Sequence, residues 1–445
     1  MDRAIEWAQG QVRHIRSLHP GLTLIECDLP DGRRIPALSY TQLAQPLAPG
    51  AWVWLNLRAL DLGLGTGGAA FVIASAPPPT ATPDPNAGPV PRPTPASPAA
   101  APGPPHSAAA EATMPPSSPP PPAGDVAGTA SGNGAAMPHP GTQREPDPEP
   151  GGPAAPSPVR PAEDSGYLVK ARYTPLQVAV RGVDSQRSPH HATLAAADSL
   201  DGLPVVVADL HSSLPAVCAA FLHDAARTTT APPRVVYVMT DGAALPIALS
   251  HTAAALRASG ALTATITAGQ AYGGDLEAVS VHSALLAAKH VLDADVAVCI
   301  QGPGNLGTDT RWGFSGVAVG DAVNAVATLG GRPVGCLRIS GADPRPRHCG
   351  LSHHSLTAYG RVALRTADLA LPVLTGALAP LGQAVAQAAR PVGAAHRLVP
   401  VEVDDLDPVL AATPHLTTMG RTYAADPAAF LAAAAAGRLA FQLRP

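Results

Sequence analysis

The most polar stretch of the part of the chain that we predict to be folded runs from residue 338 to residue 355. It holds three arginines and three histidines: Arg338, Arg345, Arg347, His348, His353 and His354. A guanidinium group carries a permanent charge and paired N–H donors, which suits carboxylate or phosphate recognition. An imidazole transfers protons near neutral pH. We therefore predict an anion site here, with His348 and His353 as candidate acid/base groups and His354 as a ligand contact.

A glycine-rich loop is the second candidate for contacts to an anion. It offers Gly302, Gly304, Asn305, Gly307 and Thr308 within a few residues. Its three glycines formally match a dinucleotide-binding pattern, but Pro303 removes one backbone N–H and no acidic residue follows the next strand. We interpret the loop either as a set of N–H and hydroxyl donors at a helix N-terminus or as a plain glycine turn.

Two more groups follow predicted strands and could act as acids or bases. His211 comes shortly after a strand that ends at Ala208, and Asp241 after one that ends at Met239. Taken singly, Asp, Ser and Gly at such places are ordinary turn and helix-cap residues. Caps do not explain the clustering of arginine and histidine, so the loops are better interpreted together.

The sequence does not define a cofactor. The histidines could ligate a metal together with Asp209, His211 or Asp241, but the chain has neither a His-Glu-x-x-His motif nor a paired-cysteine motif. We therefore assign no metal site and leave the cofactor unknown. There is also no Gly-x-Ser-x-Gly motif and no Gly-Lys-Ser/Thr phosphate loop.

The elements that must position these residues alternate between buried strands and amphipathic helices. Strands are predicted at 176–183, 204–208, 234–239, 261–267, 295–300, 333–339 and 398–403. Helices are predicted at 213–227, 245–258, 277–292, 313–329 and 356–369. This rhythm is typical of an α/β fold with a Rossmann-like, open and mostly parallel sheet. Because right-handed crossovers place the loops after such strands along one edge, we expect the polar loops to meet there.

Two other regions precede this domain, which we place at 166–445. Residues 1–76 alternate short apolar runs with turns such as Pro30-Asp31-Gly32, which predicts a small β-domain of SH3 or OB size. Residues 77–165 contain 28 of the 52 prolines and no Leu, Ile or aromatic residue. That segment has too little to bury to offset the cost of ordering it, so we predict a disordered proline-rich linker.

Charge and cysteine content narrow the possible partners. The chain carries net −4, but the predicted linker contributes eight acids and three arginines, which leaves the rest nearly neutral. A neutral domain argues against nucleic acid and against a polybasic membrane anchor. Five widely spaced cysteines and no signal-peptide pattern indicate a cytoplasmic protein. The oligomeric state stays open, and a homo-oligomer is compatible with the sequence.

The motif loops resemble an uncharacterised bacterial family, a domain of unknown function of the DUF3866 kind. The resemblance is carried by phrases such as Leu210-His-Ser212, Gly302-Pro-Gly-Asn-Leu-Gly-Thr308 and Arg347-His-Cys-Gly-Leu-Ser-His-His354. It covers the N-terminal β-region and most of 167–425, so the proline tract looks like an insertion. Because the family has no established activity, the resemblance implies no mechanism.

The sequence therefore predicts a protein that binds a small anionic ligand, with a phosphorylated compound as one candidate, and one hypothesis is that it is an acid/base enzyme. The alternative is a non-catalytic ligand sensor or assembly module that uses the same loops as its receptor site. Both hypotheses need the polar loops to line one cavity.

We expect that replacing residues 77–165 by a short Gly/Ser segment leaves the melting temperature nearly unchanged, because a segment without large apolar side chains adds little to a core. Differential scanning calorimetry of the deletion variant beside the full chain measures this. A loss of several degrees would show that the segment packs on the folded part.

Overall fold

The computed structural model describes residues 7–41, 46–57, 60, 68–78, 168–171, 178–228, 231–242 and 246–445. Almost all of the predicted proline-rich linker lies outside the described residues.

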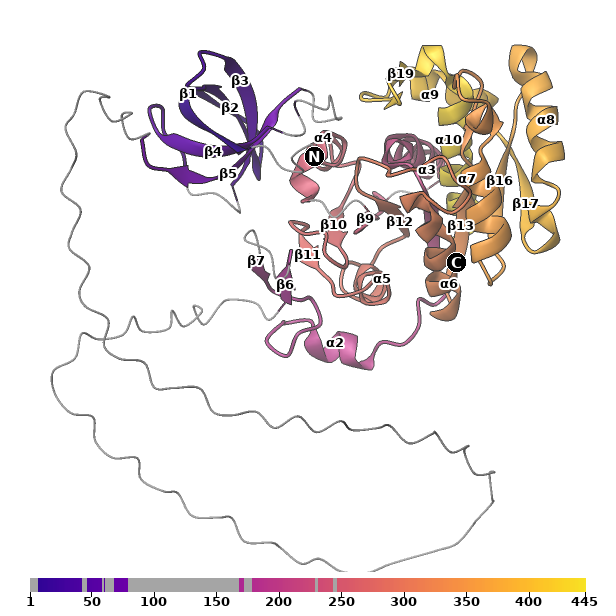
Figure 1. Cartoon of the computed structure of the whole chain (residues 1–445). Helices are drawn as coiled ribbons and strands as arrows, with labels where there is room; N and C mark the ends of the chain where they lie inside the picture. Colours follow the sequence, from indigo (N-terminus) through magenta and orange to yellow (C-terminus); the bar gives the residue numbers. More distant parts are fainter. Residues whose placement is uncertain are drawn as a thin grey trace, which may run out of the picture. The chain divides into compact units, whose positions relative to one another are not determined.

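The N-terminal region is a closed barrel of five strands, in the order β1-β2-β3-β5-β4 (Figure 1). The strands are β1 (Trp7–His19), β2 (Leu22–Asp28), β3 (Arg34–Tyr40), β4 (Trp52–Asn56) and β5 (Ala70–Ala76). The predicted turn joins β2 to β3, and Gly32 has a φ of +85°, which glycine adopts without strain. Val12, Ile25 and Val53 belong to the apolar cluster that fills the interior. The prediction of a small β-domain is confirmed.

The C-terminal region is built on a sheet of eight strands, and every pairing in it is parallel. Its order is β11-β10-β9-β12-β8-β13-β16-β17. The strands are β8 (Pro204–Ala208), β9 (Val235–Thr240), β10 (Ala264–Thr267), β11 (Leu276–Glu277), β12 (Val296–Gln301), β13 (Arg332–Cys336), β16 (Asp368–Val373) and β17 (Arg397–Glu402). This confirms the prediction of an α/β fold with a parallel sheet.

Helices cover both faces of this sheet (Figure 1). On one face α3 (Leu214–Thr228) packs against α10 (Pro427–Gln442), and α4 (His251–Ala258) lies beside α3. On the other face α5 (Val281–His290) packs beside α6 (Val319–Thr328). Two further helices follow β16 along the chain, α8 (Ala379–Ala389) and α9 (Asp407–Ala412). Coverage of both faces explains why strands such as β8 are apolar at every position.

Several predicted elements differ from the structure. Residues 176 and 177 of the strand predicted at 176–183 lie outside the described residues, and Val178–Val180 form β7, which pairs with β6 (Leu168–Lys170) in a separate antiparallel sheet. The strand at 333–339 divides into β13 and a short β14 (Ile339–Ser340). The helix at 356–369 is wrong in its second half, because α7 (His353–Thr357) and one π-helical turn (Ala358–Val362) are followed by strand β16.

Strand β16 contains a proline. Pro372 pairs with Val401 of β17, whereas β13 pairs with β16 only as far as Ala370. Pro372 therefore lies where β16 has no partner on that side, and its missing N–H is tolerated there.

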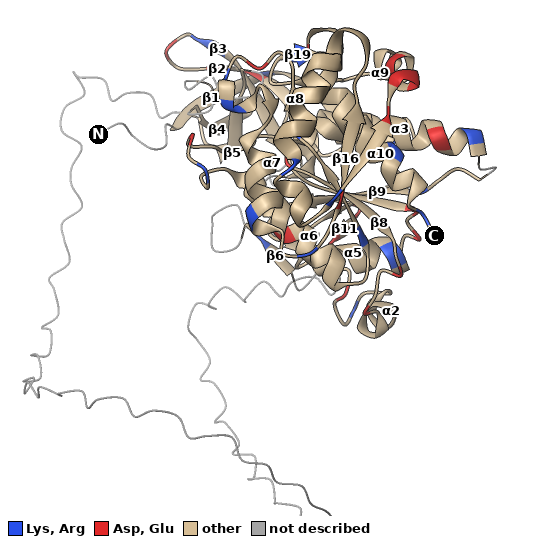
Figure 2. Cartoon of the chain, turned by 90° about the vertical axis from the view of Figure 1, so that its right-hand side faces the viewer, with Lys and Arg blue, Asp and Glu red and all other residues tan. Residues whose placement is uncertain are grey.

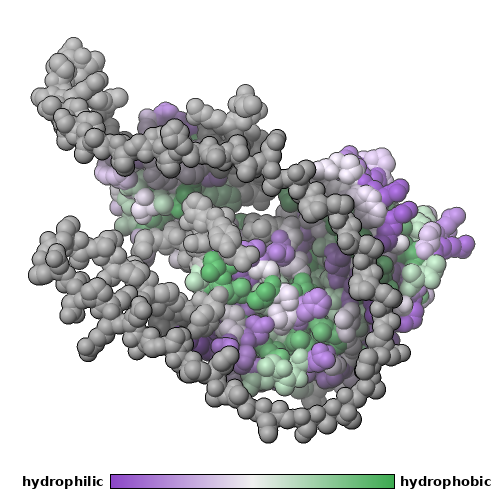
Figure 3. Space-filling model, turned by 60° about the horizontal axis from the view of Figure 1, so that its bottom comes forward, coloured by the Kyte–Doolittle hydropathy of each residue, from purple (hydrophilic) through white to green (hydrophobic). Residues whose placement is uncertain are grey.

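Charged side chains are sparse over most of the fold (Figure 2). One exception is the segment around α9, where Asp404, Asp405 and Asp407 lie close together. On the face seen in Figure 3, polar and apolar residues are interspersed over the described surface. Among the described residues, no helix combines the length and the apolar character needed to cross a membrane.

A buried cation fixes β6 to the edge of the large sheet. The Lys170 side chain is fully buried, and its Nζ donates to the carbonyl oxygens of Gly269 (2.7 Å), Ala271 (2.9 Å) and Ala278 (3.0 Å). The carboxylate of Glu277 lies 3.4 Å from the same nitrogen. All three ammonium hydrogens therefore have an acceptor, and a buried charge is matched by an acid.

We expect Lys170→Met to lower the free energy of unfolding by about 3–5 kcal/mol, because it leaves the buried Glu277 without its cation. The matched control is Lys289→Met, which makes the same change in the other lysine of the chain, a half-buried one on α5. Urea unfolding followed by circular dichroism gives both values. Equal stability of the two variants would mean that the Lys170 contacts contribute little.

Candidate functional site

The polar loops meet beyond the C-terminal ends of three adjacent strands, β12, β8 and β13. Strands β9 to β12 all lie on one side of β8. The chain then crosses to the other side of β8, where it forms β13, β16 and β17. Such a reversal of strand order is where ligands bind in parallel α/β sheets. The predicted convergence of the loops is therefore found for those that follow these three strands.

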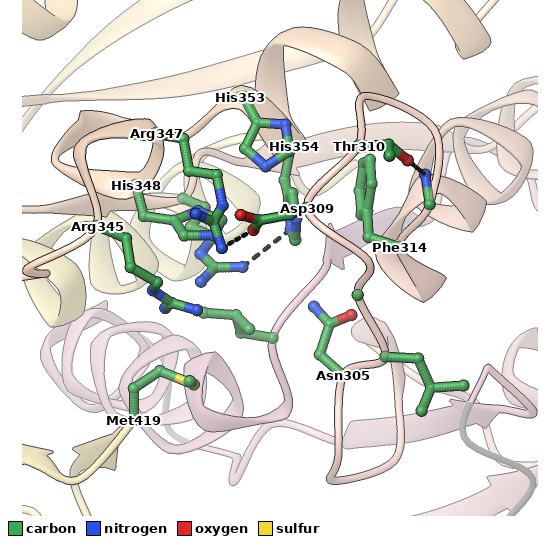
Figure 4. Close-up of a pocket in the computed structure, with 15 residues that line it drawn as sticks. Asn305, Asp309, Thr310, Phe314, Arg345, Arg347, His348, His353, His354 and Met419 are labelled. Carbon is green, nitrogen blue, oxygen red and sulfur yellow. Dashed lines mark hydrogen bonds and ion pairs between the residues drawn. The ribbon is translucent and has the colours of Figure 1, made fainter.

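These loops enclose a polar cavity of about 130 Å³. In Figure 4, Arg347, His348 and Asp309 point toward one another near its centre, and Asn305 and Met419 lie on the other side. The lining residues are Leu210, Asn305, Leu306, Gly307, Asp309, Thr310, Gly313, Phe314, Arg338, Arg345, Arg347, His348, His353, His354 and Met419.

Asp209, the first residue after β8, holds the three strand ends together. Its buried carboxylate accepts from His354 Nδ1 (2.9 Å) and Arg338 Nη1 (3.3 Å), and its backbone oxygen accepts from Gln301 Nε2 (2.8 Å). Burial acts to raise the pKa of Asp209, but the Arg338 charge and the His354 hydrogen bond outweigh it and hold that pKa below its ordinary value. Gly316 allows this arrangement, because a Cβ there would come within 2.7 Å of Asp209 Cβ.

The Asp209 contact sets the tautomer of His354. His354 Nδ1 also lies 2.9 Å from Arg338 Nη1, which is a donor. An ionised carboxylate has no proton to give, so we assign the hydrogen to Nδ1, where it points at Asp209, and the contact with Arg338 Nη1 is then not a hydrogen bond. The lone pair is then on Nε2, which has no hydrogen-bond partner among the described residues. The ring stacks on Phe314 at a centroid distance of 3.7 Å, which fixes its plane.

The other two imidazoles are kept uncharged. His348 is buried, and its Nδ1 lies 2.8 Å from Ser352 Oγ. Burial, with a smaller effect of the nearby Arg338, lowers the pKa of His348 to about 3. His353 is half-buried, and burial, with a smaller effect of the nearby Arg347 charge, lowers its pKa as well. At neutral pH both rings are therefore uncharged, and each has one nitrogen without a proton.

Each arginine of the cavity has an aspartate partner. Arg338 pairs with Asp209 in the interior. Arg345 makes two bonds to Asp343, from Nε (2.9 Å) and Nη2 (2.8 Å). Arg347 pairs with Asp309 of the glycine-rich loop. The segment that carries Arg345 and Arg347 is anchored at its two ends, where β14 pairs with β15 (Gly350–Leu351).

Five of the predicted site residues do not line this cavity. They are His211, Asp241, Gly302, Gly304 and Thr308. Both ring nitrogens of His211 have protein partners, Tyr237 Oη (3.1 Å) and Ser250 Oγ (2.6 Å), and burial lowers its pKa to about 4. Asp241 is exposed and accepts from the Gln270 backbone (3.2 Å), and Thr308 Oγ1 bonds within its own loop.

The structure also adds residues that the sequence analysis did not include in the site. Asp209 was considered only as an alternative metal ligand, although its place directly after β8 marks it as a residue of the sheet edge. Asp309, Phe314 and Met419 were not considered. Phe314 and Met419 carried no chemical signal, because their contribution depends on where the loops fold.

A scan against protein-family models gives one match, to the family described as "Protein of unknown function (DUF3866)", over residues 36–90 and 154–437. The chain belongs to this family. The matched ranges contain every lining residue of the cavity, so the site lies within the family's domain. Searches of curated proteins and of solved structures returned no match.

We expect His348 to stay neutral when the pH falls from 7.5 to 5, because enclosure disfavours its charged form. Imidazole resonances followed by NMR should show no titration of His348 in this range, in contrast to an ordinary histidine with a pKa near 6.5. A midpoint near 6.5 for His348 would show that its ring is open to water.

The same shift makes stability depend on pH. The folded pKa lies below the unfolded value, so the unfolded chain binds more protons between about pH 6.5 and 3, and stability is lost as the pH falls through that window. In His348→Asn the unfolding free energy should therefore fall less steeply over it.

Proposed function

We propose that this cavity binds a small anionic ligand, and that Arg345 and Arg347 contact its negative charge. The observation that carries the proposal is the difference in exposure among the three arginines. Arg345 and Arg347 line the cavity with about a third of each side chain exposed (34% and 33%), whereas Arg338 is 8% exposed and committed to Asp209. The first two are accessible to a ligand, and Arg338 has a supporting role.

An incoming anion can compete with the aspartates. Asp309 is 64% exposed, and ion pairs this open to water contribute only about 0–1 kcal/mol. A ligand phosphate or carboxylate could therefore displace Asp309 from Arg347 at little cost. Arg345 need not leave Asp343, because that pair uses Nε and Nη2 and leaves Nη1 without a partner among the described residues.

The rest of the cavity indicates what else the ligand carries. Leu306 and Met419 line it and are among the exposed large apolar side chains, at 66% and 56%. Small-molecule sites combine a few polar contacts with apolar surface that covers the remainder of the ligand. We therefore propose a ligand with one anionic group and an apolar or aromatic part.

The uncharged imidazoles favour chemistry on this ligand. His348 and His353 line the cavity beside Arg345 and Arg347, and a neutral imidazole accepts a proton from a bound group. This supports an acid/base enzyme as the proposed activity. A ligand sensor would use the arginines in the same way and would leave the ligand unchanged.

We expect inorganic phosphate and small carboxylates that also carry an apolar group to raise the melting temperature, since saturation at 100 times the dissociation constant stabilises a protein by about 2.7 kcal/mol. Arg345→Ala and Arg347→Ala should each weaken binding about 10- to 100-fold, as expected when a hydrogen bond to a charged group is lost. Isothermal titration calorimetry measures the constants.

The matched control is Arg13→Ala, which removes an exposed arginine paired with Asp28 in the barrel, and its binding should equal that of the wild type. Equal weakening by Arg13→Ala would mean that the loss of binding comes from the lower net charge of the protein and not from a contact in the cavity. No thermal shift with any anion tested would sink the proposal. Chromatography of the bound ligand after long incubation separates turnover, expected for the enzyme, from recovery of intact ligand, expected for the sensor.

A further inference from the structure

Three imidazoles meet on one wall of the cavity. The ring centroids of His348, His353 and His354 lie 4.5–5.1 Å apart, and one ligand nitrogen from each lies within 4.8 Å of the other two. Nitrogens bound to one tetrahedral zinc ion at about 2.0–2.1 Å are about 3.4 Å apart. Small rotations of the side chains, for which half-buried His353 has room, would close that difference.

Two of the three rings have a polar partner at Nδ1, as histidines that bind a metal usually have at their second ring nitrogen. Asp209 accepts from His354 Nδ1, and Ser352 Oγ lies at His348 Nδ1. In both rings Nε2 has no hydrogen-bond partner among the described residues, and the residues line the cavity. A histidine that binds a metal through one nitrogen almost always has its other nitrogen bonded to a carboxylate or another polar group, which fixes the ring.

Packing alone does not account for this arrangement. His211 satisfies both ring nitrogens within the protein, with Tyr237 and Ser250. His396 does the same, with Tyr359 and Ala367. His348 and His354 instead have one satisfied nitrogen each and line the same cavity, so the other nitrogen of each is available to a ligand there.

We propose that His348, His353 and His354 bind one divalent transition-metal ion and leave a coordination position open toward the cavity. Three protein ligands with one open position are typical of catalytic zinc sites, whereas structural zinc sites close the fourth position. Imidazole ligands suit zinc, cobalt, nickel and copper, and they exclude magnesium and calcium, which prefer oxygen. Zinc is the ion we expect.

The proposal deepens the proposed function and rests on it only for what fills the open position. It replaces the acid/base role of His348 and His353, because an imidazole bound to a metal has no lone pair left to accept a proton. Arg345 and Arg347 lie on the same cavity, so an anion that they hold is placed beside the metal. The ligand class is then one whose phosphate or carboxylate oxygen can coordinate zinc.

The test uses the full chain without an added histidine tag, first dialysed against a chelator. Titration with Zn²⁺ against a chromophoric chelator gives the affinity, and elemental analysis after dialysis gives the stoichiometry. We expect one zinc ion per chain, and Co²⁺ in its place should give the visible absorption of a low-symmetry site. His353→Asn should weaken Zn²⁺ binding by at least about 10- to 100-fold.

The matched control is His282→Asn, an exposed histidine on α5, which should bind Zn²⁺ like the wild type. Circular dichroism checks that the variants are folded, and His348→Asn serves as a second test of the same ligand set. Less than one zinc per chain at a tenfold excess of metal would overturn the proposal. So would unchanged affinity in folded His353→Asn.

Phosphate separates this proposal from the previous one. If phosphate binds the chelator-treated protein and zinc does not bind, the metal site is wrong and the anion site stands. If zinc binds and phosphate neither binds nor changes the zinc affinity, the anion site is wrong and the metal site stands.

Discussion

The buried carboxylate of Asp209 is the constraint on which the site depends. Its side chain fixes Arg338 and His354, which follow β13, and its backbone oxygen accepts from Gln301 at the end of β12. A single residue therefore aligns the ends of the three strands that carry the cavity. An ionised carboxylate is stable there only because a guanidinium and an imidazole N–H satisfy it, so loss of either partner would leave a buried charge at the centre of the sheet edge.

The same rule of paired charges holds the outer elements in place. Arg438, buried in α10, bonds to Asp224 on α3 and to Asp405 before α9, which fixes the most apolar helix to its neighbours. Arg421 bridges Asp426 and Asp343, and so joins the hairpin of β18 (Thr417–Thr418) and β19 (Arg421–Thr422) to the loop that carries Arg345. Most charged side chains near the site lie in an ion pair with a group of opposite charge. These pairs restrict where the side chains can lie.

The sequence predicted what depends on local pattern. The apolar runs gave β8 at its observed bounds and β9, β12 and β17 to within one residue, and the Arg/His segment contributed six of the cavity's side chains. What it missed depends on tertiary structure. Helix α10 is buried all round and has no apolar stripe to detect. His211 looked like a catalytic group, but the fold brings Tyr237 and Ser250 to its two nitrogens. The predicted linker lies almost entirely outside the described residues, and the predicted cytoplasmic location stays a prediction.

The balance of charge in the cavity explains why an anion and a metal would favour each other. Arg338, Arg345 and Arg347 are matched by Asp209, Asp343 and Asp309, and His348 and His353 are neutral. A metal cation alone would approach three guanidinium groups, and an anion alone would have to compete with Asp309. When both ligands bind, their charges nearly cancel, because the metal offsets the charge of the anion. Asp309, displaced from Arg347, is exposed and can turn toward solvent. Coupling between two bound ligands is reciprocal, so whatever the anion gains from the metal, the metal gains equally from the anion.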